Sequence, residues 1–312
     1  MVNSQDKISG ALMLGQYLNG FLLFLICQNL TPPRKEEMVQ CLVMTGICAS
    51  LLAIHQYFFG FQDMLDYLKT NQIDDPIAQA FINERRVFAP FITPNMLGGY
   101  LVMMIPLAYG LKNFRWFIPL LVIALLMTKS VGAIFSLCLV LLLAYLWNKQ
   151  IKIYVLLGML ALLSTTIVTL FLRTQTTAWH SPLFSVQMRW DYWMESIGII
   201  KDHPWVGIGL GSFDLNNSRY AHNSYLQLWA QSGPLAVITF LILVGTILRA
   251  GLCVVKASAA PLLASGALIA LMVFLIHNMI DFTFFLPETG LIAAVIAGLL
   301  LNPQRSCPRS AA

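Results

Sequence analysis

Four basic side chains of this sequence are best suited to chemistry: Arg86, Arg189, Arg219 and His222. A guanidinium group presents a planar fork of N–H donors that matches phosphate oxygens, and an imidazole can accept a proton near neutral pH. Together they could offset charge on a diphosphate leaving group while the histidine takes the proton of an attacking hydroxyl. The set therefore predicts transfer of a group from a diphosphate to an acceptor hydroxyl.

Carboxylates that could hold a divalent metal for such a reaction are poorly placed. The chain has no Asp-x-Asp pair, and Asp63 with Asp66 or Asp74 with Asp75 lack any further ligand pattern. The cysteines form no CxxC motif and no Cys/His cluster with zinc spacing. The sequence thus favours a metal-independent mechanism without a cofactor.

The elements that must position these side chains are membrane helices. Of the 312 residues, 58% are hydrophobic and 11% are charged, and the mean hydropathy is +0.73. Soluble domains carry about 25% charged residues, so the composition excludes a water-soluble enzyme. A helix crosses a bilayer with about 20 apolar residues. We predict one all-α polytopic bundle, residues 1–312, with about nine spans: residues 8–33, 38–62, 87–111, 114–128, 130–148, 153–172, 223–248, 257–280 and 289–302.

The basic residues between these spans predict the orientation of the bundle. More than half of the 19 lysines and arginines lie in short loops and in the tail from residue 303, and cytoplasmic loops collect such residues. The opposite, extracytoplasmic side then carries two sizeable loops, residues 62–86 and 173–222. The second of these is predicted to carry the active site.

The longer outer loop holds most of the remaining signals. Apolar and aromatic residues recur every three or four positions over residues 186–200, which predicts an amphipathic helix on the membrane surface. The glycine run at residues 207–211 lacks the spacing and context of a dinucleotide loop, so we interpret it as a tight turn that lets backbone approach a ligand. The loop ends at His222, at the mouth of a long apolar helix.

Each candidate residue also has a purely structural interpretation. Arginines at a membrane surface can contact lipid headgroups or pair with Glu84, and a histidine at a helix start often caps the helix. His277 and Asp281, four residues apart, could form an oriented catalytic pair or only stabilise a helix end. The gathering of the basic residues on one predicted face favours the catalytic interpretation.

Short segments along the chain, taken in order, resemble those of a known family. Its membrane half is matched by residues 86–95, Pro106 and residues 128–130, its large loop by Arg189, Pro204, residues 207–209 and residues 221–223, and its closing segment by His277, Asp281 and Pro287. Between about residues 86 and 287 the chain therefore resembles the O-antigen ligase and polymerase superfamily of bacterial membrane glycosyltransferases.

The resemblance implies a GT-C-like membrane enzyme. Such an enzyme takes a glycan from an undecaprenyl-diphosphate carrier and passes it to an acceptor hydroxyl, with inversion at the anomeric carbon. The reaction takes place on the periplasmic or exterior face of the bacterial inner membrane. The implied acceptor is lipid A core, a protein or another glycan, and nucleic acid is not an expected partner.

The resemblance also implies roles for individual residues. His222 falls on the family's loop histidine, the general base, and Arg86, Arg189 and Arg219 fall on its donor diphosphate ligands. The residues expected to shape the acceptor site are Asn223, Tyr225, Gln227, His277 and Asp281.

Two departures from the family pattern change these expectations. Val131 stands where many members have arginine, which removes one phosphate contact, although Lys129 could partly supply its charge. Members usually have more than nine helices, so we expect the chain to be short at its amino end.

Two alternative functions stay open at this point. A polymerase of the same superfamily would differ only in its acceptor, a second carrier-linked glycan. An anion transporter of the bicarbonate-like type would place ionisable groups near the bilayer midplane, whereas here they gather at the predicted outer surface. The sequence therefore favours an enzyme over a transporter.

Overall fold

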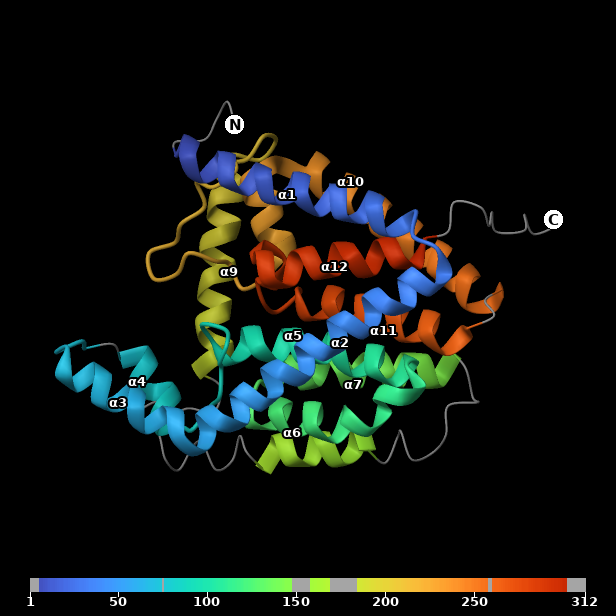
Figure 1. Ribbon diagram of the computed structural model, residues 1–312. Helices are drawn as coiled ribbons and strands as arrows, with labels where there is room; N and C mark the ends of the chain where they lie inside the picture. Colours follow the sequence, from blue (N-terminus) through green and yellow to red (C-terminus); the bar gives the residue numbers. More distant parts are fainter. Residues whose placement is uncertain (1–5, 75, 148–157, 169–183, 258–259, 302–312) are drawn as a thin grey trace. The chain divides into compact units, whose positions relative to one another are not determined.

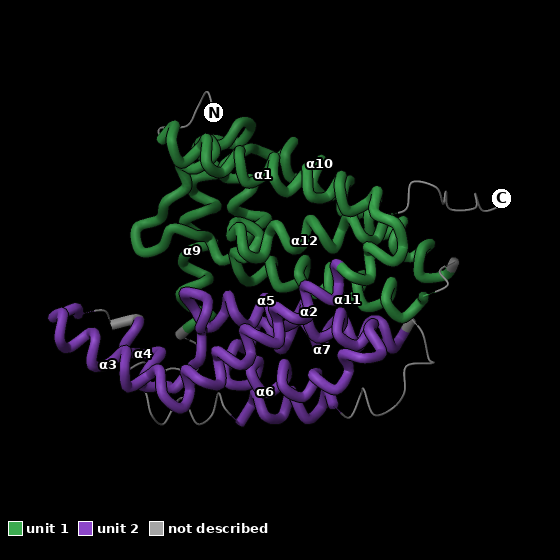
Figure 2. Tube along the Cα trace, viewed as in Figure 1, with its two compact units in different colours: residues 1–37, 185–312 green, residues 38–184 purple. Residues whose placement is uncertain are grey.

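The computed structural model describes residues 6–74, 76–147, 158–168, 184–257 and 260–301. Every regular element in these ranges is a helix (Figure 1), and the one isolated β-bridge found there joins Leu215 to Ser218. The prediction of an all-α protein is confirmed. The chain divides into two compact units, residues 1–37 with 185–312 and residues 38–184 (Figure 2). Parts of the predicted span 153–172 and of the predicted loop 173–222 lie outside the described residues.

Three helical stretches of the described chain are long and apolar enough to cross a membrane: Lys7–Gln28, Pro32–Thr70 and Ser224–Lys256. The shorter apolar helices are Val131–Leu146, Gly158–Val168, Pro261–His277 and Pro287–Leu300. Each of these stretches overlaps a predicted span. The helices are thus compatible with membrane insertion, while the number of spans and their orientation stay predictions.

The first unit is built from α1 (Lys7–Gln28), the first residues of α2 (Pro32–His55) and the later helices of the chain. Asp6 starts α1, because its carboxylate accepts hydrogen bonds from the amides of Ile8 and Ser9. Prolines begin α11 and α12, where a missing amide hydrogen is tolerated. The later elements are α9 (Phe184–Asp202), α10 (Ser224–Ala257), α11 (Pro261–His277), the 3₁₀ turn η3 (Thr283–Phe285) and α12 (Pro287–Leu300).

Small residues let α1 and α12 pack closely side by side (Figure 1). Gly290, Ala294 and Gly298 follow one another at intervals of four residues, which places them on one face of α12. Ala294 lies beside Gly20 of α1, and a methyl group added to Gly298 would lie 2.5 Å from the Phe24 carbonyl oxygen. Contacts between small residues are typical of helix pairs in membranes.

The ammonium group of Lys35 closes the C-terminal end of α12. Its Nζ donates hydrogen bonds to the carbonyl oxygens of Leu299, at 3.1 Å, and Leu301, at 2.5 Å. The last carbonyl groups of a helix lack helical partners and carry partial negative charge, so a cation stabilises them. We expect Lys35→Met to lower the free energy of unfolding by about 1–2 kcal/mol, measured by denaturant unfolding in detergent micelles.

Arg34→Met is the matched control for this prediction. Arg34 forms an exposed ion pair with Glu37, and its loss should change the free energy of unfolding by less than about 0.5 kcal/mol. Equal destabilisation by both variants would contradict the capping role of Lys35.

The second unit is centred on α5 (Pro94–Gly110), which is buried along most of its length. Thr93 caps α5 by accepting a hydrogen bond from the Met96 amide. α6 (Ile118–Thr128) and α7 (Val131–Trp147) pack on α5, and Gly98 leaves room for Ser130. The other described elements are the later part of α2, the π-helical turn η1 (Gln56–Gly60), α3 (Phe61–Thr70), α4 (Pro76–Asn83), the 3₁₀ helix η2 (Lys112–Phe117) and the helix Gly158–Val168.

The helix predicted for residues 186–200 is present as α9. The side of α9 formed by Tyr192, Ile199 and Ile200 packs against a small core that includes Phe213 and Leu215 of the same loop. α9 therefore organises the segment that leads to His222. Contact of α9 with a membrane surface stays a prediction.

Candidate active site

One buried carboxylate, Asp281, brings together basic side chains from three parts of the first unit. Its Oδ2 lies 3.9 Å from Nη2 of Arg189 in α9 and 3.7 Å from Nε2 of His277 at the end of α11. Its Oδ1 lies 4.0 Å from Nδ1 of His222, in the loop before α10. The Asp281 side chain is only 1% exposed, against 23% for His222. The structure thus joins Arg189, His222, His277 and Asp281, which we call the Asp281 cluster, while their catalytic roles stay predictions.

Hydrogen bonds hold the loop that carries His222. The His222 carbonyl oxygen accepts a bond from Nε1 of Trp193 at 3.3 Å, and the residue has left-handed backbone, with φ of 49°. The Ala221 amide donates to Oε1 of Gln227 at 3.1 Å. Oδ1 of Asn223 accepts bonds from the amides of residues 225 and 226, which caps α10. Asn223 and Gln227, which we predicted to shape the acceptor site, therefore fix the His222 loop against α10.

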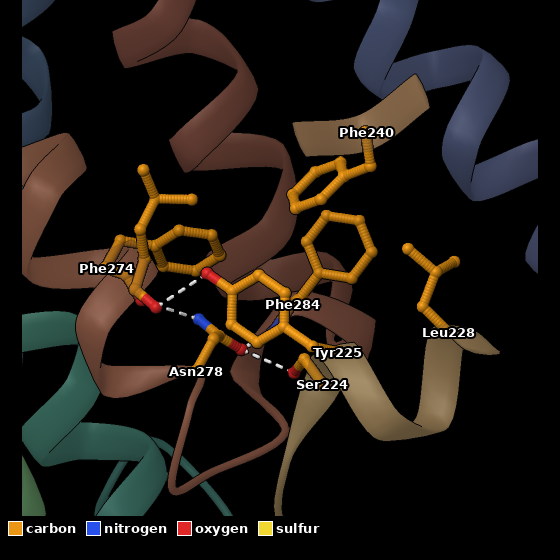
Figure 3. Close-up of a pocket in the computed structure, with 8 residues that line it drawn as sticks. Ser224, Tyr225, Leu228, Phe240, Phe274, Asn278 and Phe284 are labelled. Carbon is orange, nitrogen blue, oxygen red and sulfur yellow. Dashed lines mark hydrogen bonds between the residues drawn. The ribbon is translucent and has the colours of Figure 1, made fainter. Parts of the chain in front are cut away.

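A second set of hydrogen bonds joins the start of α10 to the end of α11 (Figure 3). Ser224 Oγ donates to Oδ1 of Asn278 at 2.7 Å, and the Ser224 amide donates to the Asn278 carbonyl oxygen at 2.9 Å. The Tyr225 hydroxyl donates to the Leu275 carbonyl oxygen at 2.9 Å, beside a small cavity half of whose lining residues are aromatic. Sequence reasoning missed Ser224 and Asn278. Their positions in the sequence could have pointed to them, because Ser224 lies two residues after His222 and Asn278 directly follows His277.

The surroundings of His222 favour its neutral form. Burial lowers the pKa of the imidazole, the Asp281 carboxylate raises it and the Arg189 guanidinium lowers it, with a net shift below the ordinary value. Nδ1 is buried without a hydrogen-bond partner among the described residues and lies on the side of Asp281. The arrangement leaves Nε2 as the nitrogen for an incoming hydroxyl. A neutral imidazole at this position can accept a proton.

The glycine run forms the predicted tight turn, but the backbone that it meets is the protein's own. Gly207 has φ of 67°, which side-chain-bearing residues rarely adopt. The amides of Ile208 and Gly209 donate hydrogen bonds to the carbonyl oxygens of residues 230 and 231, at 2.9 and 3.0 Å. These carbonyl groups precede a break in α10 at Gly233, where φ is 77° and ψ is 176°. The α10 backbone fills the space beside Gly207, and the approach of this turn to a ligand stays a prediction.

The other predicted donor ligands lie outside the Asp281 cluster. In the second unit, the buried Arg86 donates from Nε to the Thr128 carbonyl oxygen and from Nη2 to Asn95 Oδ1, each at 3.1 Å. Lys129 Nζ donates to the Glu84 carbonyl oxygen at 2.6 Å, so residues 84–95 and 128–130 are held together. Arg219 is exposed on the large loop.

Within the described part of the chain, no group of three or more His, Cys, Asp or Glu side chains is arranged to hold a metal ion.

Comparison with known proteins identifies the central part of the chain. No curated protein matches the sequence. Residues 116–241 match the family model described as O-antigen ligase. The matched segment includes Arg189, the glycine turn and His222, whereas Arg86, His277 and Asp281 lie outside it. The match confirms the resemblance seen in the sequence: over residues 116–241 the chain is similar to the O-antigen ligase family.

Proposed function

We propose that the protein is a membrane glycosyltransferase that moves a glycan from an undecaprenyl-diphosphate carrier to an acceptor hydroxyl, as an O-antigen ligase does. The observation that carries the proposal is the partly exposed His222 imidazole beside the buried Asp281 and the Arg189 guanidinium. The active site faces the outside of the bacterial inner membrane, on the side where the loop charges place the large loop.

The proposed reaction uses one base and one group of cations. The acceptor hydroxyl donates a hydrogen bond to Nε2 of His222, and its oxygen attacks the anomeric carbon of the donor sugar while the proton passes to the imidazole. The bond between that carbon and the diphosphate oxygen breaks, and the carrier diphosphate leaves with the electron pair. Arg189 offsets the charge that develops on the leaving group, and Asp281 stabilises the imidazolium that forms.

The remaining predicted residues support these steps. Arg86 and Arg219 contribute further cationic contacts to the donor diphosphate, with Arg219 on the exposed part of the loop. His277 shares the Asp281 carboxylate with His222 and so influences how strongly that carboxylate attracts the base. Asn223, Tyr225 and Gln227 shape the acceptor site by fixing the start of α10.

Two other functions, those of a polymerase and of an anion transporter, differ from the proposed one in acceptor and in carrier release. A polymerase would use the same cluster with a second carrier-linked glycan as acceptor. An anion transporter would move its substrate without releasing the carrier. In the Asp281 cluster, His222 and Asp281 lie in loops and His277 ends α11, while Arg189 lies within α9. These positions favour chemistry at a membrane surface over transport through the midplane.

Turnover of an undecaprenyl-diphosphate-linked oligosaccharide in proteoliposomes tests the proposal. Wild-type and His222→Ala protein are compared with chelator present, with candidate acceptors supplied in turn and with carrier release followed beside acceptor mass. We expect release by the wild type only, with at least a 100-fold lower rate for the variant, roughly the contribution of a general base. Donor binding should persist in His222→Ala. Equal transfer by both proteins would remove the base assignment, and no release with any acceptor would favour transport.

The pH dependence of transfer follows from the lowered pKa of His222. The base must be neutral to accept a proton, so the rate should rise with pH with a midpoint below the ordinary histidine value of about 6.5. This rise is measured from initial transfer rates between about pH 4.5 and 8, with the donor at saturating concentration. A midpoint above the ordinary value would contradict the assignment of a partly buried, neutral His222 as base.

A further inference from the structure

Two aromatic rings enclose the His222 imidazole. The Tyr192 ring of α9 stacks on it, with ring centroids 5.5 Å apart and an interplanar angle of 20°. The Phe282 ring meets it edge-on, with centroids 4.7 Å apart and an angle of 88°. Tyr220 stacks on Phe282 with centroids 4.1 Å apart and so packs against that ring. The imidazole therefore contacts rings from α9 and from the segment after α11.

Polar contacts alone do not fix the plane of the imidazole. Within the described chain, Nδ1 of His222 has no hydrogen-bond partner, and the 4.0 Å to Asp281 Oδ1 exceeds hydrogen-bond length. A charge at that distance attracts the ring but leaves rotation about the Cβ–Cγ bond broad, because this torsion has weak intrinsic preferences. Packing by neighbouring rings is the contact that restricts the rotation.

We infer that Tyr192 and Phe282 are positioning residues that hold the His222 imidazole in one plane, so that Nε2 faces the acceptor hydroxyl. The inference rests on the proposed role of His222 as base. Phe282 is 7% exposed, directly follows Asp281, and donates its amide hydrogen to Oδ1 of that carboxylate at 2.8 Å. The same short segment thus carries both the Phe282 ring and the Asp281 oxygen that lie beside His222.

The rings also exclude water from His222, which favours the neutral imidazole. The charged groups that act on His222 are Asp281 and Arg189, and His277 contacts the same carboxylate. Tyr192 is additionally near Asp191 and Glu195. A substitution of the Tyr192 ring leaves all of these groups in place. A changed titration of His222 in such a variant therefore reports the loss of aromatic cover.

The test compares Tyr192→Phe, which keeps the ring, with Tyr192→Ala, which removes it. The full chain is labelled with ¹⁵N-histidine in lipid nanodiscs, and the His222 signal is assigned by its loss in His222→Asn. We expect Tyr192→Phe to titrate and turn over like the wild type. Tyr192→Ala should titrate at higher pH and show a kcat about 10-fold lower, with the donor KM within about twofold.

Controls separate positioning from general destabilisation. Trp190→Ala removes a ring that is 59% exposed on the same helix and should leave the His222 titration unchanged. Phe282→Leu keeps an apolar side chain at a buried position and gives a second test if Tyr192→Ala does not fold. Unchanged titration and kcat in folded Tyr192→Ala or Phe282→Leu would overturn the inference, as would equal losses in Tyr192→Phe and Tyr192→Ala. Failure of the proposed function has a different signature, which is undiminished transfer by His222→Asn.

Discussion

Asp281→Asn is expected to lower the rate of glycan transfer by about 100-fold or more, because three basic side chains share this one carboxylate. The amide keeps the shape of the side chain but removes the negative charge. His222 then becomes a weaker base, since Asp281 raises the pKa of His222, and the imidazolium formed during transfer loses its counter-ion. The measurement is kcat in proteoliposomes together with its pH profile, whose rising limb should move to lower pH.

The same substitution should also destabilise the fold. Removing one partner from a buried charged group leaves the others uncompensated, which typically costs about 3–5 kcal/mol. Part of this cost is avoided because burial already favours the neutral form of His222. Asp214→Asn, at an exposed carboxylate of the same loop, is the control and should leave both kcat and the free energy of unfolding unchanged. Full activity of folded Asp281→Asn would show that the carboxylate only packs the helix end.

Gly233→Ala is expected to lower the free energy of unfolding by about 3 kcal/mol or more, or to prevent folding of the large loop. The backbone at Gly233 lies in a region that is essentially restricted to glycine. The added methyl group would also collide with the Trp205 carbonyl group of the glycine turn. Because that turn leads from α9 towards His222, transfer activity should fall with stability. Unfolding in detergent micelles and turnover in proteoliposomes measure the two effects.

Gly245→Ala provides the matched comparison on the same helix. A methyl group at Gly245 would meet no described atom within 4 Å, and alanine is the better helix former. This variant should be neutral or more stable by up to about 1 kcal/mol. A similar decrease in the free energy of unfolding for Gly233→Ala and Gly245→Ala would contradict the prediction. It would show that the effect does not depend on the backbone break at Gly233.

The positions of the apolar helices could be predicted, because a bilayer imposes both helical structure and a minimum apolar length. Their ends could not. The uncharged stretch before α5 starts at residue 87, but α5 starts at Pro94. The difference arises because Oε1 of Gln56, in the π-helical turn, accepts hydrogen bonds from the amides of Phe88 and Ala89 at 2.8 and 2.9 Å and holds this segment as a loop.

The candidate site was predictable where its contacts are local in sequence. His277 and Asp281 are separated by four residues, so the helical period alone indicates that they can pair. Asp281 and His222 are far apart in the sequence, so the helical period cannot predict the contact between them. The contact of the glycine turn with α10 was missed for the same reason. The positive φ angles of the turn could be predicted from its glycines, but the carbonyl groups that accept its hydrogen bonds lie in α10.

The break in α10 also bears on how deeply the proposed site would lie in a bilayer. At about 1.5 Å per residue, residues 234–256 form a helix about 34 Å long, close to the roughly 30 Å hydrocarbon thickness of a membrane. This part of α10 is long enough to cross by itself. The turns that precede Gly233, together with His222, can then lie level with the lipid headgroups. On the proposed insertion, we expect the position of Gly233 to set the height of His222 relative to the boundary between lipid tails and water.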